Sequence, residues 1–118
     1  MKYTKFAKYV RKLMIDNDEN LSDLSKVFDV SISFVSSVFV GKKVIPEKWI
    51  DLIVSHYNLD KDHENQLINL YGESKDSLKI DMSTLNNERK QMVVQFQRKL
   101  ESLSDTDVET LQKIFERK

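Results

Sequence analysis

The sequence contains no cysteine, which excludes disulfide bonds, thiolate zinc sites and a cysteine nucleophile. The absence fits a reducing compartment, and we expect a cytoplasmic protein. No apolar run approaches the roughly 18 residues of a membrane span, so we expect no membrane segment. The stretch from Met1 to Lys12 is amphipathic and lacks the continuous apolar core of a signal peptide.

Residues that form turns are scarce, with two glycines and one proline among 118 residues. A β-sandwich or barrel needs many tight turns, so the composition disfavours both. Charged residues make up 32% and hydrophobic residues 40%, which is typical of amphipathic helices. The length allows one domain, or one small domain with an appendage. The fold class predicted is therefore all-α.

The residue types that carry chemistry are also sparse. The chain has no glycine-rich phosphate loop and no serine with an evident histidine and aspartate partner, so we expect no enzyme, no cofactor and no small-molecule ligand. His56 and His63 have acidic neighbours, but helix ends are rich in such residues, and we expect no metal site.

The formal net charge is zero, because 19 Lys and Arg balance 19 Asp and Glu. The charges are unevenly distributed. Residues 1–15 carry five cations and no acid, residues 16–41 carry five acids against Lys26, and residues 42–50 carry three lysines against Glu47. A zero total therefore conceals two local cationic segments that are able to contact an anionic partner.

Apolar residues recur at helical spacing through the first part of the chain and predict five helices. The first helix runs from Thr4 to Ile15, and the second starts at Asn20. The third runs from a cap at Ser31 or Ser33 through Val40. The fourth has Pro46 in its first turn, and the fifth starts at Asp60 and ends near Gly72.

The second and third helices are separated by three or four residues, which is helix-turn-helix spacing. Leu24 is followed by the small Ser25, Asp29 lies in the turn, and Gly41-Lys42 follows the third helix. With these residues, the segment 20–46 resembles the helix-turn-helix of the lambda-repressor-like family, also called the XRE or Cro/C1 class. The resemblance implies a five-helix DNA-binding domain over residues 1–72, in which the third helix reads the DNA.

The turn and the third helix both depart from the family pattern. Asp29 stands where the turn usually has glycine, and aspartate tolerates the left-handed region better than most residues. The third helix is expected to bury Val35, Val38 and Phe39, and its exposed positions hold no Arg, Lys, Gln or Asn. The best readers of base edges are therefore missing, and phosphate contacts and DNA shape should contribute more.

We expect the chain to bind double-stranded DNA as a sequence-specific transcription regulator, a repressor of the phage or mobile-element type. The predicted DNA-contacting residues are Ser31, Ile32, Ser33, Phe34, Ser36, Ser37, Lys42, Lys43 and Lys8. An alternative stays open, because Ile32 and Phe34 are apolar and suit a protein surface. On that interpretation the domain is a protein-interaction module, an antirepressor or a host-factor inhibitor.

Residues 73–118 are predicted to hold a linker, a short β-strand and two helices. Apolar and polar residues alternate from Ser77 to Met82, and a lone strand needs a partner, which a second copy would supply. The helices are expected from Asn86 to Leu103 and from a cap at Ser104 or Asp105. Their apolar stripe either packs on the first domain or pairs two copies. DNA symmetry favours a homodimer, through Leu78, Ile80, Met82, Phe96, Leu100, Leu111 and Phe115.

Overall fold

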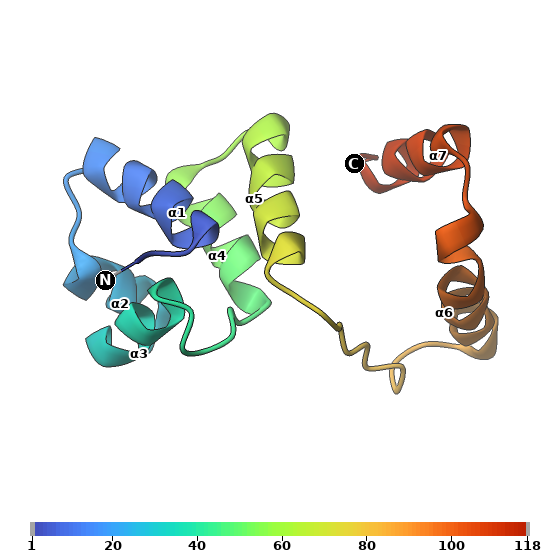
Figure 1. The fold of residues 1–118 in the computed structure, drawn as a ribbon, viewed down its shortest axis with the longest axis horizontal. Coiled ribbons are helices and arrows are strands. Elements are labelled where there is room, and N and C mark those ends of the chain that lie inside the picture. Colours follow the sequence, from blue (N-terminus) through green and yellow to red (C-terminus); the bar gives the residue numbers. More distant parts are fainter. Residues whose placement is uncertain (1, 118) are drawn as a thin grey trace. The chain divides into compact units, whose positions relative to one another are not determined.

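The computed structural model describes residues 2–117, which form seven α-helices and one short 3-10 helix (Figure 1). They divide into an N-terminal unit, Met1–Leu78, and a C-terminal unit, Lys79–Lys118. The helices are α1 (Lys5–Asp16), α2 (Leu21–Phe28), α3 (Ile32–Phe39), α4 (Lys48–Tyr57), α5 (Lys61–Glu73), α6 (Asn87–Lys99), the 3-10 helix η1 (Leu100–Ser102) and α7 (Asp105–Phe115). The predicted all-α class is confirmed for these residues.

Four helices of the N-terminal unit begin at the capping residues that the sequence predicts. The side chains of Thr4, Asn20, Ser31 and Asp60 each accept a hydrogen bond from the backbone N–H three residues later. Each cap satisfies a backbone donor that has no partner inside its helix, which fixes the starting residue. The fourth helix begins later than expected, at Lys48, and Pro46 precedes it.

The core of the N-terminal unit is built around Trp49 of α4, which is fully buried. The Phe28 ring stacks on the indole with 3.9 Å between ring centroids, and the Phe34 ring meets it edge-on at 5.9 Å. These contacts join α2 and α3 to α4. Helices α1 and α5 complete the core with the buried Phe6, Ala7, Val10, Met14, Leu67 and Tyr71.

The strand predicted between Ser77 and Met82 is wrong, because the described residues form no strand at all. The Ser83 N–H donates to Asp81 Oδ1 at 2.9 Å, and the Leu85 N–H donates to the Met82 carbonyl at 3.1 Å. The backbone therefore turns toward α6 just after the alternating segment. An alternating pattern makes a strand only where a second strand supplies the ladder, and the described chain offers none.

The C-terminal unit differs from the first in having no buried residue among positions 79–117. Asn86, where the first helix was expected to begin, is its N-cap, and Ser104, one of the two candidate caps, begins the second helix in a reciprocal capping box with Asp107. The long helix expected through Leu103 ends at Lys99 and continues as η1. Local hydrogen bonds thus define these helices without a core of their own.

Candidate nucleic-acid interface

The turn between α2 and α3 rests on Asp29, whose backbone is left-handed with φ 55° and ψ 48°. The Val30 N–H donates to the Ser25 carbonyl at 3.0 Å, which closes the end of α2. Ser25 is only 8% exposed, so a small side chain at this position permits the close approach of the two helices. The left-handed conformation predicted for Asp29 is confirmed, and it directs the chain into α3.

Helix α3 buries one face and exposes its N-terminal end. Val35, Val38 and Phe39 are buried as predicted, whereas Ile32 and Ser33 are exposed. Ser31 is also exposed, and its Oγ accepts a hydrogen bond of 3.1 Å from the Phe34 N–H. The half-buried residues of this helix include Ser36 and Ser37. The exposed ones among the predicted contact residues of α3 and its cap, Ser31, Ile32 and Ser33, therefore lie at the start of the helix.

Phe34 does not occupy the freely exposed position that the sequence predicts. It is half-buried and its ring packs edge-on against Trp49. The helical spacing alone places position 34 outside the buried stripe, but the large indole of α4 extends far enough to cover the ring. Phe34 therefore has a packing role, and only part of its side chain is available to a ligand.

The loop after α3 holds two exposed lysines against the helix end. The N–H groups of Lys42 and Lys43 both donate to the Ser37 carbonyl, at 2.9 and 3.2 Å. The chain turns at Gly41, whose φ is 85°, and this turn allows both hydrogen bonds. Glycine suits the position because a side chain would strain that conformation. The two lysine backbones are thus fixed relative to α3, while their side chains extend into solvent.

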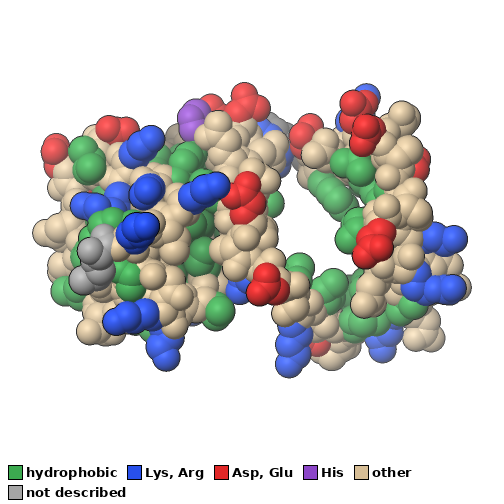
Figure 2. Space-filling view, viewed as in Figure 1, with side chains coloured by type: hydrophobic (Ala, Val, Ile, Leu, Met, Phe, Trp, Pro, Cys, Tyr) green, Lys and Arg blue, Asp and Glu red, His purple; other side chains and the backbone are tan. Residues whose placement is uncertain are grey.

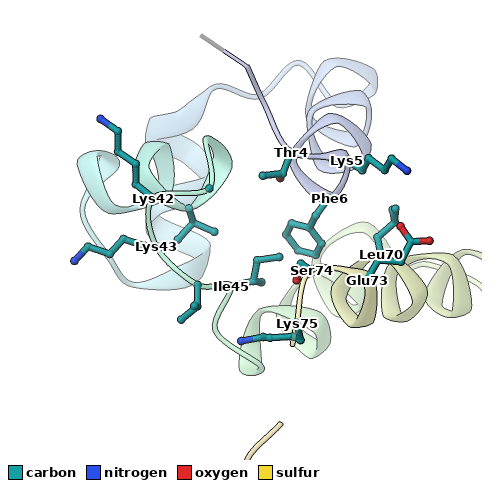
Figure 3. Close-up of a pocket in the computed structure, with 13 residues that line it drawn as sticks. Thr4, Lys5, Phe6, Lys42, Lys43, Ile45, Leu70, Glu73, Ser74 and Lys75 are labelled. Atoms are coloured by element: carbon teal, nitrogen blue, oxygen red, sulfur yellow. The ribbon is translucent and has the colours of Figure 1, made fainter. Parts of the chain in front are cut away.

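The first turn of α1 lies beside the end of α3. The Thr4 N–H donates to the Phe39 carbonyl at 2.9 Å. Thr4, Lys5, Lys42 and Lys43 line one open cavity of about 490 Å³ together with apolar residues such as Phe6. Figure 3 shows the Lys42 and Lys43 side chains directed away from Phe6 and outward from the loop. Their ammonium groups are therefore available to a ligand on the outer surface.

The cationic segments found in the sequence belong to this same surface. Lys and Arg side chains gather over α1 and the neighbouring loop in the view of Figure 2, and Lys8 on α1 is exposed. The sequence holds no acid from Val30 to Pro46. The Arg11 guanidinium lies over the Tyr3 ring at 4.3 Å, a cation–π contact that keeps this charge on the face.

Two acids near the start of α2, Glu19 and Asp23, are engaged by other groups. The Glu19 carboxylate accepts a hydrogen bond from the Tyr57 hydroxyl and contacts His56 Nε2. Burial, and then the hydrogen bond to Glu19, raise the pKa of Tyr57 above its ordinary value. Asp23 completes the capping box with Asn20 at the start of α2. The α1–α2 turn is thereby bound to α4 as well as to α2.

The two histidines lie in separate pairs. His63 donates its N–H to Asp60, and this backbone hydrogen bond, followed by the side-chain one, lowers the pKa of Asp60. His56 pairs with Glu19 instead. Within residues 2–117, no three His, Cys, Asp or Glu side chains gather in a way that would hold a metal ion.

Two residues near the lysines are missing from the list of predicted DNA contacts, although Lys5 belongs to the cationic segment of residues 1–15. Val44 is 74% exposed, although it is a large apolar residue beside Lys43. Lys5 lines the same cavity as Lys42 and Lys43. Spacing gives a signal for Lys5, since it precedes Lys8 by three residues on one helix. Val44 has no such signal, because a loop has no periodicity.

The residues predicted for dimerisation are divided between the two units. Leu78 ends the N-terminal unit and is exposed, while Ile80 and Met82 lie before α6 without forming a strand. Phe96, Leu100 and Phe115 are exposed on α6, η1 and α7, and Leu111 is half-buried. The prediction that two copies pair through a strand at Leu78–Met82 is therefore wrong.

Comparisons of the chain with protein-family models, with curated proteins and with solved structures found no match. Function is accordingly inferred from the residues themselves. In the described part of the chain, no helix combines the length and the apolar character that crossing a membrane requires.

Proposed function

We propose that this chain is a sequence-specific DNA-binding transcription regulator of the lambda-repressor-like type, with α3 inserted in the major groove. The observation that carries the proposal is that α3 exposes residues at its start and holds two exposed lysines at its end, within a segment, residues 30–46, that contains no acid. Ser31 and Ser33 are exposed at the start of α3, and Lys42 and Lys43 are fixed to its last turn by their backbone hydrogen bonds. Such a helix fits the major groove, which is wide enough to admit it.

Phosphate binding is assigned to the lysines. Lys42, Lys43 and Lys8 are exposed, and the Thr4–Phe39 hydrogen bond holds α1 beside the end of α3. Cations at one end of a reading helix fix its position on the duplex but carry no sequence information. Each phosphate contact releases counterions, so affinity should fall steeply with salt.

Base reading is assigned to the serine hydroxyls and to Ile32. Hydroxyl groups at Ser33 and Ser37 are able to bond base edges, and Ile32 offers an apolar contact to a thymine methyl group. These contacts discriminate less than a bidentate arginine or glutamine does. DNA shape and deformability should therefore supply a large share of the specificity.

The test begins with selection of bound duplexes from a random pool, followed by a search for the enriched site beside the gene itself. The Lys42→Ala/Lys43→Ala protein is then measured on the selected duplex and on an unrelated one. We expect weaker binding to both duplexes and a salt slope reduced by about two, since each lost phosphate contact reduces it by nearly one.

A matched control removes two exposed lysines elsewhere, as Lys61→Ala/Lys79→Ala, which changes the net charge equally. The control should retain the wild-type salt slope. An unchanged slope in the Lys42→Ala/Lys43→Ala protein would falsify the phosphate assignment. Ser33→Ala and Ser37→Ala should instead alter the sequence preference at single positions, with little change on unrelated DNA.

The regulator is proposed to act in the cytoplasm as a homodimer on two half-sites, and as a repressor of the phage or mobile-element type. A two-fold dimer matches two-fold symmetric DNA and doubles the number of cations that contact phosphate. Because the local cationic set is small, the second subunit contributes strongly to affinity at physiological salt.

A second candidate function is a protein-interaction module, an antirepressor or a host-factor inhibitor. It is favoured by two exposed apolar side chains, since Ile32 at the start of α3 is 48% exposed and Val44 in the loop after α3 is 74% exposed. Ile32→Ser and Val44→Ser leave the core intact. Loss of a stoichiometric protein partner in these variants, with no DNA retained by the wild type, would support this function over DNA binding.

A further inference from the structure

The C-terminal unit exposes most of its apolar side chains, although residues 79–117 form two capped helices. Phe115 is 69% exposed, and the other exposed apolar residues of this unit include Met92, Val94, Phe96, Leu100, Val108 and Ile114. A pair of short helices without buried side chains gains little from packing, and isolated helices of this length are marginal in water. The unit therefore needs a partner surface.

Some of these apolar residues follow helical spacing and form one stripe along each helix. The stripe that runs from α6 through η1 to the residue after it is Val93, Phe96, Leu100 and Leu103, and the stripe on α7 is Val108, Leu111 and Phe115. Their separations alternate between three and four residues, which is the spacing of helices that pack side by side in bundles and coiled coils. Each helix thus presents a narrow apolar stripe suited to a second helix.

Helices α6 and α7 carry opposite net charge. Helix α6 holds four cations and one acid, a net charge of +3, whereas α7 holds three acids and one cation, a net charge of −2. Lys90 and Lys99 lie three residues from Val93 and Phe96, and Asp105 lies three residues from Val108. Residues three apart are neighbours on a helix, so these charges border the apolar stripes.

We propose that a second copy of this chain covers the stripes, with α6 of one subunit packed against α7 of the other. In a two-fold dimer this contact occurs twice, and each occurrence places the cationic border of α6 against the acidic border of α7. Pairing α6 with α6, or α7 with α7, would oppose like charges instead. The arrangement specifies the interface of the homodimer named under the proposed function, and its formation requires no DNA.

The experiment exchanges the charges between two versions of the full-length chain. One version carries Lys90→Glu and Lys99→Glu, so that α6 and α7 are both acidic. The other carries Asp105→Lys and Gln112→Lys, which borders α7 with cations and leaves the capping box of Ser104 and Asp107 intact. Sedimentation equilibrium without DNA gives the dimer dissociation constant, and circular dichroism checks the helix content.

The wild-type chain is expected to be a dimer at micromolar concentration. Each charge variant alone should raise the dissociation constant about tenfold or more, and an equimolar mixture should restore a dimer that contains one copy of each. A single-site control compares Lys99→Glu with Arg98→Glu, because Arg98 is neither three nor four residues from any member of the stripe. Only the Lys99 change should weaken the dimer.

A monomeric wild-type chain would overturn the proposal, and so would folded variants that fail to pair when mixed or that dimerise as tightly as the wild type. Failure here leaves the DNA assignment measurable, since the salt slope of Lys42→Ala/Lys43→Ala reports phosphate contacts in a monomer as well. Conversely, a mixed dimer without DNA binding would support this interface and reject the regulator.

Discussion

The main-chain N–H of Thr4 donates a hydrogen bond of 2.9 Å to the main-chain carbonyl of Phe39. This bond joins two residues that are far apart in the sequence, one at the cap of α1 and one at the last turn of α3. It satisfies a carbonyl that has no partner inside its helix. It also brings the cations of α1 next to those of the loop at Lys42 and Lys43, so two separate cationic segments become one surface.

Gly41 lies at this junction, and we expect Gly41→Ala to destabilise the protein by about 1 kcal/mol. The backbone at Gly41 has φ 85°, and an added Cβ would meet Thr4 Cγ2 at 3.4 Å. Urea unfolding of the full chain measures the change. Gly72→Ala is the control, because Gly72 lies in α5 with nothing within 4 Å, and alanine should stabilise that helix by about 0.5 kcal/mol or more. Equal effects at both glycines would contradict the assignment.

The turn residue Asp29 gives a second prediction. Its left-handed backbone disfavours any side chain with a branched Cβ, so Asp29→Val should cost about 1–2 kcal/mol, while Asp29→Gly should be at least as stable as the wild type. Thermal unfolding followed by circular dichroism compares the two. A valine variant as stable as the glycine variant would show that the turn tolerates another conformation.

Ser25 provides a third prediction about the approach of α2 and α3. Ser25→Ala should change stability little, since the Ser25 hydroxyl bonds only to Ser22 in its own helix. Ser25→Leu should destabilise the protein by about 2 kcal/mol, because a large side chain overfills the space between the helices. The leucine variant should also bind the selected duplex more weakly, as the displacement of α3 moves its serines. Denaturant midpoints and a binding titration together check both effects.

Stability at high pH should depend on Tyr57. Its pKa is raised by burial and by the hydrogen bond to Glu19, so the folded state holds the proton more tightly than the unfolded state. The stabilisation is fully present below the ordinary pKa of 10.0 and is lost as pH rises above it. Tyr57→Phe should cost about 1 kcal/mol at neutral pH and flatten this loss.

Urea unfolding at neutral pH and above pH 10 measures the effect of Tyr57→Phe. Part of the slope should remain in the variant, because burial also raises the pKa of Tyr9. A variant that loses stability above pH 10 as steeply as the wild type would reject the role of Tyr57.

Local chemistry along the sequence was sufficient to place most helix starts. Thr4, Asn20, Ser31 and Asp60 cap their helices because each offers a short polar side chain to a nearby backbone N–H, an interaction that needs no distant residue. The left-handed turn at Asp29 was predictable for the same reason. Helical spacing likewise identified Val35, Val38 and Phe39 as buried.

Features that need contact between two distant segments of the chain were decided by the tertiary structure alone. The alternation from Ser77 to Met82 formed no strand, because a strand requires a partner that the described residues do not supply. Phe34 became half-buried because the Trp49 ring reaches it from α4. The sequence by itself determined the helices, their caps and the cationic segments. Only the packing of α1 against α3 joined those segments, because hydrogen bonds and contacts between distant residues leave no local pattern.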